Sequence, residues 1–138
     1  MKVYTKPDND PQLHHTAKRI TPNSLEKVIE VFEQLRCKLT YRPDGARWAM
    51  VGQDGLAFDI QLVEVDEKPV QSKTRASSHV AFISNTPAEQ IERVEKWAAQ
   101  NGIRFEKGGW SDKELWFDLP DLFVDFVVEV MQVSITQE

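Results

Sequence analysis

The strongest constraint on the fold of this chain is that one order of predicted strands and helices occurs twice. The first half reads as a strand, an amphipathic helix and three further strands, and the second half repeats that β-α-β-β-β order. The expected elements of the first half are 15–20, 25–35, 37–41, 46–51 and 56–65, and those of the second half are 79–83, 87–101, 103–105, 115–119 and 122–131. Repetition of this kind predicts two copies of one unit that bury their apolar faces together.

The apolar residues of both helical segments recur at helical spacing, so each helix is expected to pack on a sheet. Ser24 is the expected N-cap of the first helix. Thr86, with Pro87 after it and Glu89 three residues on, is the expected N-cap of the second, and Gly102 is its expected end.

These elements predict an α+β fold, in which two βαβββ modules form one cupped, mostly antiparallel sheet with the helices on its outer face. A chain of 138 residues suits a single domain. Its expected parts are a polar N-terminal arm (1–12) and a domain over 13–138, which consists of module one (13–66), a polar linker (67–78), module two (79–131) and a tail (132–138).

Charge and cysteine content narrow the class of protein. The net charge is −5, which argues against nucleic acid and anionic membrane surfaces as partners. No apolar stretch reaches the roughly 18 residues of a membrane helix, and the N-terminus lacks the apolar core of a signal peptide. Cys37 is the single cysteine, so no disulfide forms within the chain, and the cytoplasm is the expected compartment.

Four polar residues occupy matching places in the two halves. His15 and His79 begin the first strand of each half, Gln61 and Asp125 lie in the last strand, and 64 residues separate the members of each pair. Because alternate residues of a strand face opposite sides, the apolar neighbours of Asp125 mark the helix side and leave Asp125 on the other. All four side-chain types can bind a metal, so the helix-free face is the candidate site.

The strand that begins His79-Val-Ala-Phe and the helix after it resemble the start of a module in the vicinal oxygen chelate superfamily, the group of glyoxalases, bleomycin resistance proteins and extradiol dioxygenases. The strand from His15 is less similar, because Lys18 and Arg19 replace apolar residues. Members of this superfamily consist of two βαβββ modules around a metal ion. The resemblance spans residues 13–131 and implies the same fold.

The resemblance implies His15, Gln61, His79 and Asp125 as the metal ligands. Iron, manganese, nickel, cobalt and zinc all accept such donors. In the superfamily a divalent ion holds two adjacent oxygens of a substrate and stabilises developing negative charge. Gln61 cannot act as a base, so Glu129 and Asp59 are the candidate catalytic groups.

Arg47, Trp48 and Trp116 are the candidate substrate-binding residues, because a cation and aromatic rings facing the cup would hold a small molecule. Each candidate also has a plainer explanation. The histidines begin strands as polar residues, and Gln61 hydrogen-bonds a neighbouring strand. Asp125 forms a salt bridge with a lysine or arginine, and the tryptophans lie in the core or at a dimer contact.

Three functions follow from these alternatives. The leading one is a metal-dependent, glyoxalase-like enzyme of lyase, isomerase or dioxygenase type that acts on a small oxygenated substrate. The alternative is a non-catalytic protein of the same fold that sequesters a drug or another small ligand without a bound metal. The third is a structural or regulatory domain that binds a partner. Small members of the superfamily commonly pair, so the resemblance also implies a homodimer.

Overall fold

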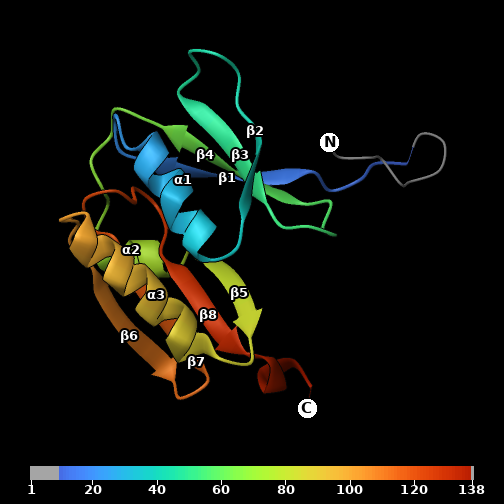
Figure 1. The fold of residues 1–138 in the computed structure, drawn as a ribbon, viewed down its shortest axis with the longest axis vertical. Coiled ribbons are helices and arrows are strands. Elements are labelled where there is room, and N and C mark those ends of the chain that lie inside the picture. Colours follow the sequence, from blue (N-terminus) through green and yellow to red (C-terminus); the bar gives the residue numbers. More distant parts are fainter. Residues whose placement is uncertain (1–9, 138) are drawn as a thin grey trace.

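The computed structural model describes residues 10–137, and the first nine residues of the expected N-terminal arm lie outside them. Module one consists of β1 (His15–Ile20), α1 (Leu25–Gln34), β2 (Lys38–Tyr41), β3 (Trp48–Gly52) and β4 (Asp59–Glu64). Module two consists of β5 (Val80–Ser84), α3 (Pro87–Gln100), β6 (Glu106–Ser111), β7 (Glu114–Asp118) and β8 (Val128–Gln132). The predicted α+β fold of two βαβββ modules is therefore confirmed (Figure 1).

Each module forms one four-stranded sheet. The strand order is β1-β4-β3-β2 in the first sheet, which we name sheet A, and β5-β8-β7-β6 in the second, sheet B. The first and last strands of each module pair in parallel, and the other neighbours are antiparallel. An isolated bridge between Ile20 and Phe123 connects the modules, so the expected single sheet is present as two halves.

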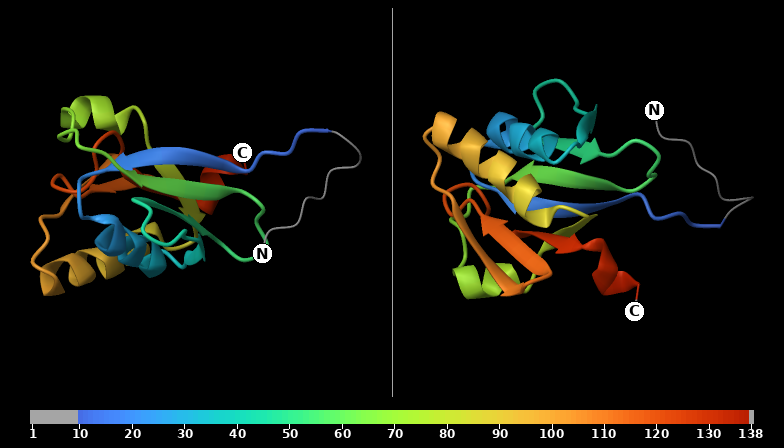
Figure 2. Two further views of the ribbon diagram at one scale, coloured as in Figure 1. Left: turned by 90° about the horizontal axis from the view of Figure 1, so that it is seen from above. Right: turned by 60° about the horizontal axis from the view of Figure 1, so that its bottom comes forward.

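Helices α1 and α3 lie side by side on one side of both sheets (Figures 1 and 2). The core between helices and sheets contains Val28 and Phe32 of α1, Val94 of α3, and Leu62 and Val128 of the sheets, all fully buried. Burying one such side chain contributes about 1.5–3 kcal/mol to stability. Both modules share this core, so neither sheet has an independent hydrophobic interior.

The start of α1 is capped by a residue distant in sequence. Ser24 occupies the predicted N-cap position, but its hydroxyl donates to Thr21 O (2.6 Å). The carboxylate of Glu64 instead accepts a hydrogen bond from Leu25 N (3.0 Å), and an acid at this place also complements the helix dipole. Thr86 precedes α3 as predicted, without a side-chain cap.

The expected polar linker contains a short helix, α2 (Ser72–Ala76). It lies on the side of sheet B opposite α1 and α3 (Figure 2, left). Arg75 donates to both carboxylate oxygens of Asp118 at the end of β7 (2.6 and 2.7 Å) and to Val70 O (2.9 Å). Both side chains of the ion pair are almost completely buried, so the linker is fixed to the face of sheet B away from α1 and α3. Apart from α2, no helix of the described residues covers this face, and we call it the helix-free face. A partner 43 residues away leaves no local signal in the sequence.

The segment before β8 differs from the expectation. A strand was expected over 122–131, but β8 begins only at Val128. The rings of Phe123 and Phe126 stack on each other (centroids 4.2 Å apart), and Val124 N donates to Arg19 O (3.0 Å). A continuous apolar run conceals such a break, because buried strand and buried loop have the same composition. A short 3-10 helix, η1 (Val133–Thr136), follows β8. In the described part of the chain no helix has the length and apolar character needed to cross a membrane.

Candidate functional site

The helix-free face of sheet B carries a histidine–glutamate pair. His79, just before β5, places Nε2 3.4 Å from Oε1 of Glu129 on β8. Nδ1 of the same ring lies 3.0 Å from Ala76 O and must donate, since a carbonyl oxygen only accepts. The proton is thus fixed on Nδ1, and Nε2 faces Glu129. A backbone carbonyl that orients a histidine in this way is typical of metal-ligating histidines.

Glu129 is only 4% exposed although its carboxyl group lies in a candidate site. Burial is the main cause that raises the pKa of Glu129 above its ordinary value; the nearby His79 lowers this pKa and the negative charge of Glu114 raises it. Removal of a carboxylate from water destabilises its charged form. A cation next to the Glu129 carboxylate would therefore offset the cost of its burial.

The strand register identifies the residues of module one that are equivalent to this pair. In module two, His79 stands two residues before Ala81, which pairs with Glu129. In module one, His15 stands two residues before Ala17, which pairs with Gln61. The structural counterpart of Gln61 is therefore Glu129, four residues beyond the Asp125 expected from equal spacing.

Asp125 lies in the irregular segment before β8 and contacts β1 of the other module. Its Oδ1 accepts from Arg19 N (2.9 Å), and its Oδ2 lies 3.8 Å from Nε of Arg19. This is the plainer environment considered above for Asp125, a salt bridge with an arginine. The structure brings Glu129, not Asp125, beside His79.

The two halves of the expected ligand set lie on different sheets, His15 and Gln61 on sheet A and His79 beside sheet B. Thr16, Lys18 and Ile60 line a cleft of about 480 Å³ together with residues 79–83 of module two. Alternate residues of β1 and β4 point to the other side of sheet A, and these are His15 and Gln61. Within residues 10–137, no three histidine, cysteine, aspartate or glutamate side chains lie close enough to hold a metal ion. The described part of one chain therefore does not bring His15, His79 and Asp125 together.

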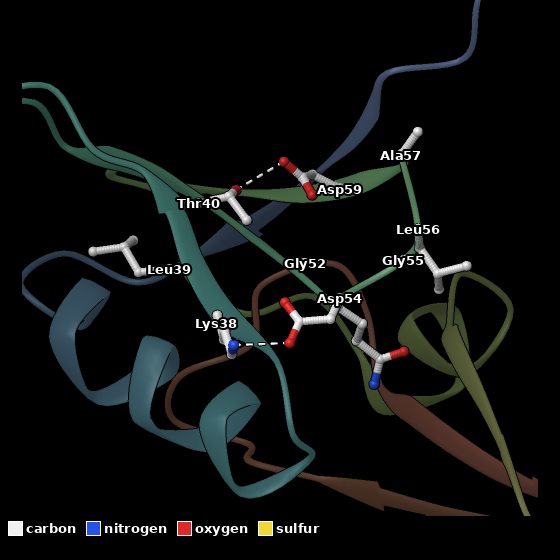
Figure 3. A pocket seen from close by; sticks show the side chains of 10 residues that line it. Lys38, Leu39, Thr40, Gly52, Asp54, Gly55, Leu56, Ala57 and Asp59 are labelled. Atoms are coloured by element: carbon white, nitrogen blue, oxygen red, sulfur yellow. Dashed lines mark hydrogen bonds and ion pairs between the residues drawn. The ribbon is translucent and has the colours of Figure 1, made fainter. Parts of the chain in front are cut away.

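Asp59 is next to His15 in the strand register and is only 2% exposed. Its Oδ2 accepts from Thr40 Oγ1 (2.8 Å), at one side of a cavity of about 430 Å³ (Figure 3). Gly52 leaves the space for this carboxylate, because a Cβ there would overlap Asp59 Oδ1. Burial, together with the charge of Asp59, raises the pKa of Cys37 to about 12, so this thiol is unreactive at neutral pH.

The three expected substrate-binding residues have different surroundings. Arg47 donates to Asp66 (2.8 Å) and Glu64 (3.3 Å), and the hydrogen bond to Asp66 is the main cause that raises the pKa of Arg47. Trp48 packs against Tyr41, with ring centroids 5.7 Å apart. Trp116 is the member that lies on the same face as the histidine–glutamate pair, since it is the direct neighbour of Glu129 on β7.

Two residues of the segment 108–110 lie near Trp116. The ring of Trp110 lies 5.1 Å from His79 and 6.5 Å from Trp116, measured between centroids. Gly108 lies directly beneath Trp116, because a Cβ at Gly108 would be 2.6 Å from its Cζ2. The sequence Gly-Gly-Trp at 108–110 is the local signal, but a turn explains it equally well from sequence alone.

Comparisons with known proteins agree with this architecture. No protein-family model matches the sequence, and no curated protein matches it. Solved structures match along nearly the whole chain. The chain has the vicinal oxygen chelate fold. The resemblance stated from the sequence is thus confirmed at the level of the fold.

Three of the structures with this fold illustrate its range. A protein of the glyoxalase family from Bacillus anthracis has 16% identity and a TM-score of 0.56, over 92% of this chain and 98% of its own. An antibiotic-binding protein from a Streptomyces species has 13% identity and a TM-score of 0.56, over 91% and 98%. A fosfomycin resistance protein from Listeria monocytogenes, in complex with manganese(II) and a dihydroxypropylphosphonic acid, has 14% identity and a TM-score of 0.54, over 91% and 95%.

Proposed function

We propose that this chain forms a homodimeric, metal-dependent enzyme of the glyoxalase type that acts on a small oxygenated substrate. The observation that carries the proposal is the pair of His79 and Glu129, with Nε2 directed at the carboxylate, and its register-matched counterpart of His15 and Gln61. A divalent ion is the common partner of imidazole nitrogen, carboxylate and amide oxygen.

The donor chemistry fits such an ion. His79 is held in the tautomer with a proton on Nδ1, which leaves the Nε2 lone pair for a metal. Glu129 is buried without a lysine or arginine among its recorded ion-pair partners, and a cation would offset the cost of its burial. The related fold that holds manganese(II) supports a divalent ion as the cofactor. Once bound, the ion would act as a Lewis acid toward substrate oxygens.

A carboxylate of this chain would then have to transfer the proton to or from the substrate. If Glu129 binds the ion, Asp59 is the remaining acid next to the module-one half-site, because it pairs with His15 in the register. Its Oδ2 is oriented by the hydroxyl of Thr40. We therefore propose Asp59 as the base that exchanges a proton with substrate in the completed site.

A second chain would complete the site. β1 and β5 are edge strands of their sheets, which favours pairing with another sheet. Large apolar side chains near these edges are exposed, namely Leu13, Leu56, Phe58 and Ile83. Such residues are typical of interfaces. In a two-fold dimer, module one of each chain would meet module two of its partner. Buried, unpaired Cys37 is compatible with the cytoplasm as the compartment.

Metal affinity measured by calorimetry tests the ligand assignment. His79→Ala and Glu129→Ala should each weaken manganese(II) binding by more than about tenfold, because even residues that only orient metal ligands contribute about 10–100-fold. Asp125→Asn is the matched control, since Asp125 contacts Arg19 and should leave the affinity unchanged. Circular dichroism verifies that each variant folds. Unchanged affinity in Glu129→Ala together with loss in Asp125→Asn would reverse the assignment.

A second function is favoured by one specific observation. Trp110 contacts His79, and Trp116 lies next to Trp110 on the same face of sheet B. A ligand-sequestering protein would use Trp110 and Trp116 to hold its ligand without a metal. The antibiotic-binding neighbour has the same fold. Elemental analysis distinguishes the two proposals: about one divalent ion per chain supports the enzyme, and ligand binding by metal-free protein supports sequestration.

A further inference from the structure

Trp116 lies flat on the helix-free face of sheet B. The gap left by the missing side chain of Gly108 receives its indole ring, with Cζ2 only 2.6 Å from the position of a Cβ. Gly108 and Trp116 pair directly across β6 and β7. An aromatic ring laid against a strand exposes its other face, and such a face is a platform on which a planar ring stacks.

Trp110 extends this platform toward the histidine–glutamate pair. Trp110 is 44% exposed, and its ring contacts the rings of both Trp116 and His79. The planes of the two indoles differ by only 30°, an angle at which both rings can contact one flat ligand. The polar end of this surface is Glu129, whose carboxyl group neighbours Trp116 on the adjacent strand. A ligand on the platform therefore has its edge at the candidate metal position.

The charge of the same face is negative. The register places four acids on it: Glu106, Glu114, Asp118 and Glu129. The strand residues that share this face include no lysine or arginine at the paired positions of β5 to β8. Arg75 of α2 is bound to both oxygens of Asp118 and is therefore not available to a ligand. A divalent ion at Glu129 would leave the sum of these charges at or below zero.

We infer that the ligand of this site is a planar aromatic molecule without a negative charge, which stacks on Trp110 and Trp116 beside Glu129. Stacking favours a flat ring system, and the surrounding acids repel an anion and attract a cation. The inference rests on the proposed function for the location of the site. The inference goes beyond the proposed function because it names the class of ligand. It applies both to an enzyme and to a ligand-sequestering protein.

The test uses three probes of equal size and different charge: 2-naphthol, N-methylquinolinium and naphthalene-2-sulfonate. Binding to the full-length wild-type protein is measured by quenching of tryptophan fluorescence and by calorimetry. We expect the neutral and cationic probes to bind at least about tenfold more tightly than the sulfonate, with the difference reduced by salt. Equal or tighter binding of the sulfonate, or no binding of any probe, would overturn the inference.

Two glycine variants show whether the platform is the binding surface. Gly108→Ala displaces Trp116 and should weaken the neutral probe by about three- to tenfold, the usual contribution of an aromatic pair. Gly109→Ala is the control, because its Cβ would meet Ser111 O and Leu115 Cδ2 at 3.0 and 3.1 Å instead of Trp116. Equal affinities of the Gly108→Ala and Gly109→Ala variants for the neutral probe would contradict the stacking surface. Metal content is measured on the same wild-type sample, so failure of the proposed function is recognised independently of the ranking of the probes.

Discussion

Two variants that each lack a half-site should restore metal binding when they form a mixed dimer. One carries His15→Ala and Gln61→Ala, which removes the donors of module one, and the other carries His79→Ala and Glu129→Ala, which removes those of module two. In each homodimer, every site lacks two of its four donors. In the heterodimer, the two undamaged modules belong to different chains and would meet at one of the two sites.

The expected recovery follows from this geometry. Random exchange gives the two homodimers and the heterodimer in a ratio of about 1:2:1, so about a quarter of all sites regain four donors. Heterodimers purified through two different affinity tags should contain about one ion per dimer, against two in the wild type and none in either parent. The measurement is elemental analysis after gel filtration, with light scattering to verify the dimeric mass.

A matched control uses His79→Ala in one chain and Glu129→Ala in the other. Both changes lie in module two, so neither site of that heterodimer is complete and its ion content should stay at the level of the two parent homodimers. A gain of bound metal in the control heterodimer would refute a site shared between chains. So would the absence of bound metal from the heterodimer of the two half-site variants. A monomeric wild-type protein would refute it as well, because within residues 10–137 of one chain no three such side chains lie close enough to hold an ion.

Three further substitutions test how individual side chains affect the stability of the folded protein. Arg75→Met leaves the Asp118 carboxylate buried without its partner, and urea unfolding should show a loss of about 3–5 kcal/mol, which a second change, Asp118→Leu, largely restores. Glu129→Gln should raise the melting temperature at pH 7, because the raised pKa means that the folded state disfavours the charged carboxylate. The gain should shrink as the pH falls toward 4.5, and a gain confined to acidic pH would contradict this sign. Gly52→Ala should cost about 1–3 kcal/mol by overlap with Asp59, and Asp59→Ala should relieve that overlap.

The fold was predictable because its signals are local and periodic. The apolar stripe of α1 and the proline that begins α3 follow from residues within one or two helical turns. The repeat then sets the order of the strands, since both halves have the same pattern. Contacts between residues far apart in the sequence were less predictable. Glu64 reaches the start of α1 from 39 residues away, and Arg75 reaches Asp118 from 43, distances at which a sequence pattern carries no information about contact.

Asp125 and Glu129 illustrate why the site was harder to predict than the fold. Both are acids in one apolar run, and four residues apart they fall on the same face of any strand that contains them. Equal spacing between the halves favours Asp125, but the segment before β8 bends to pair with β1, which shifts the register by four residues.

What distinguishes the two acids is the group that each one meets. Asp125 meets the backbone and guanidinium of Arg19, which satisfy a carboxylate in place. Glu129 meets Nε2 of His79, whose Nδ1 donates to Ala76 O, and its carboxylate is almost completely buried. A carboxylate already bound by an arginine stabilises the junction of two modules, whereas one left with an imidazole in a buried setting is suited to chemistry. If Glu129 is the functional acid, as we propose, its position is decided by the partner across the strand, which the repeat alone cannot specify.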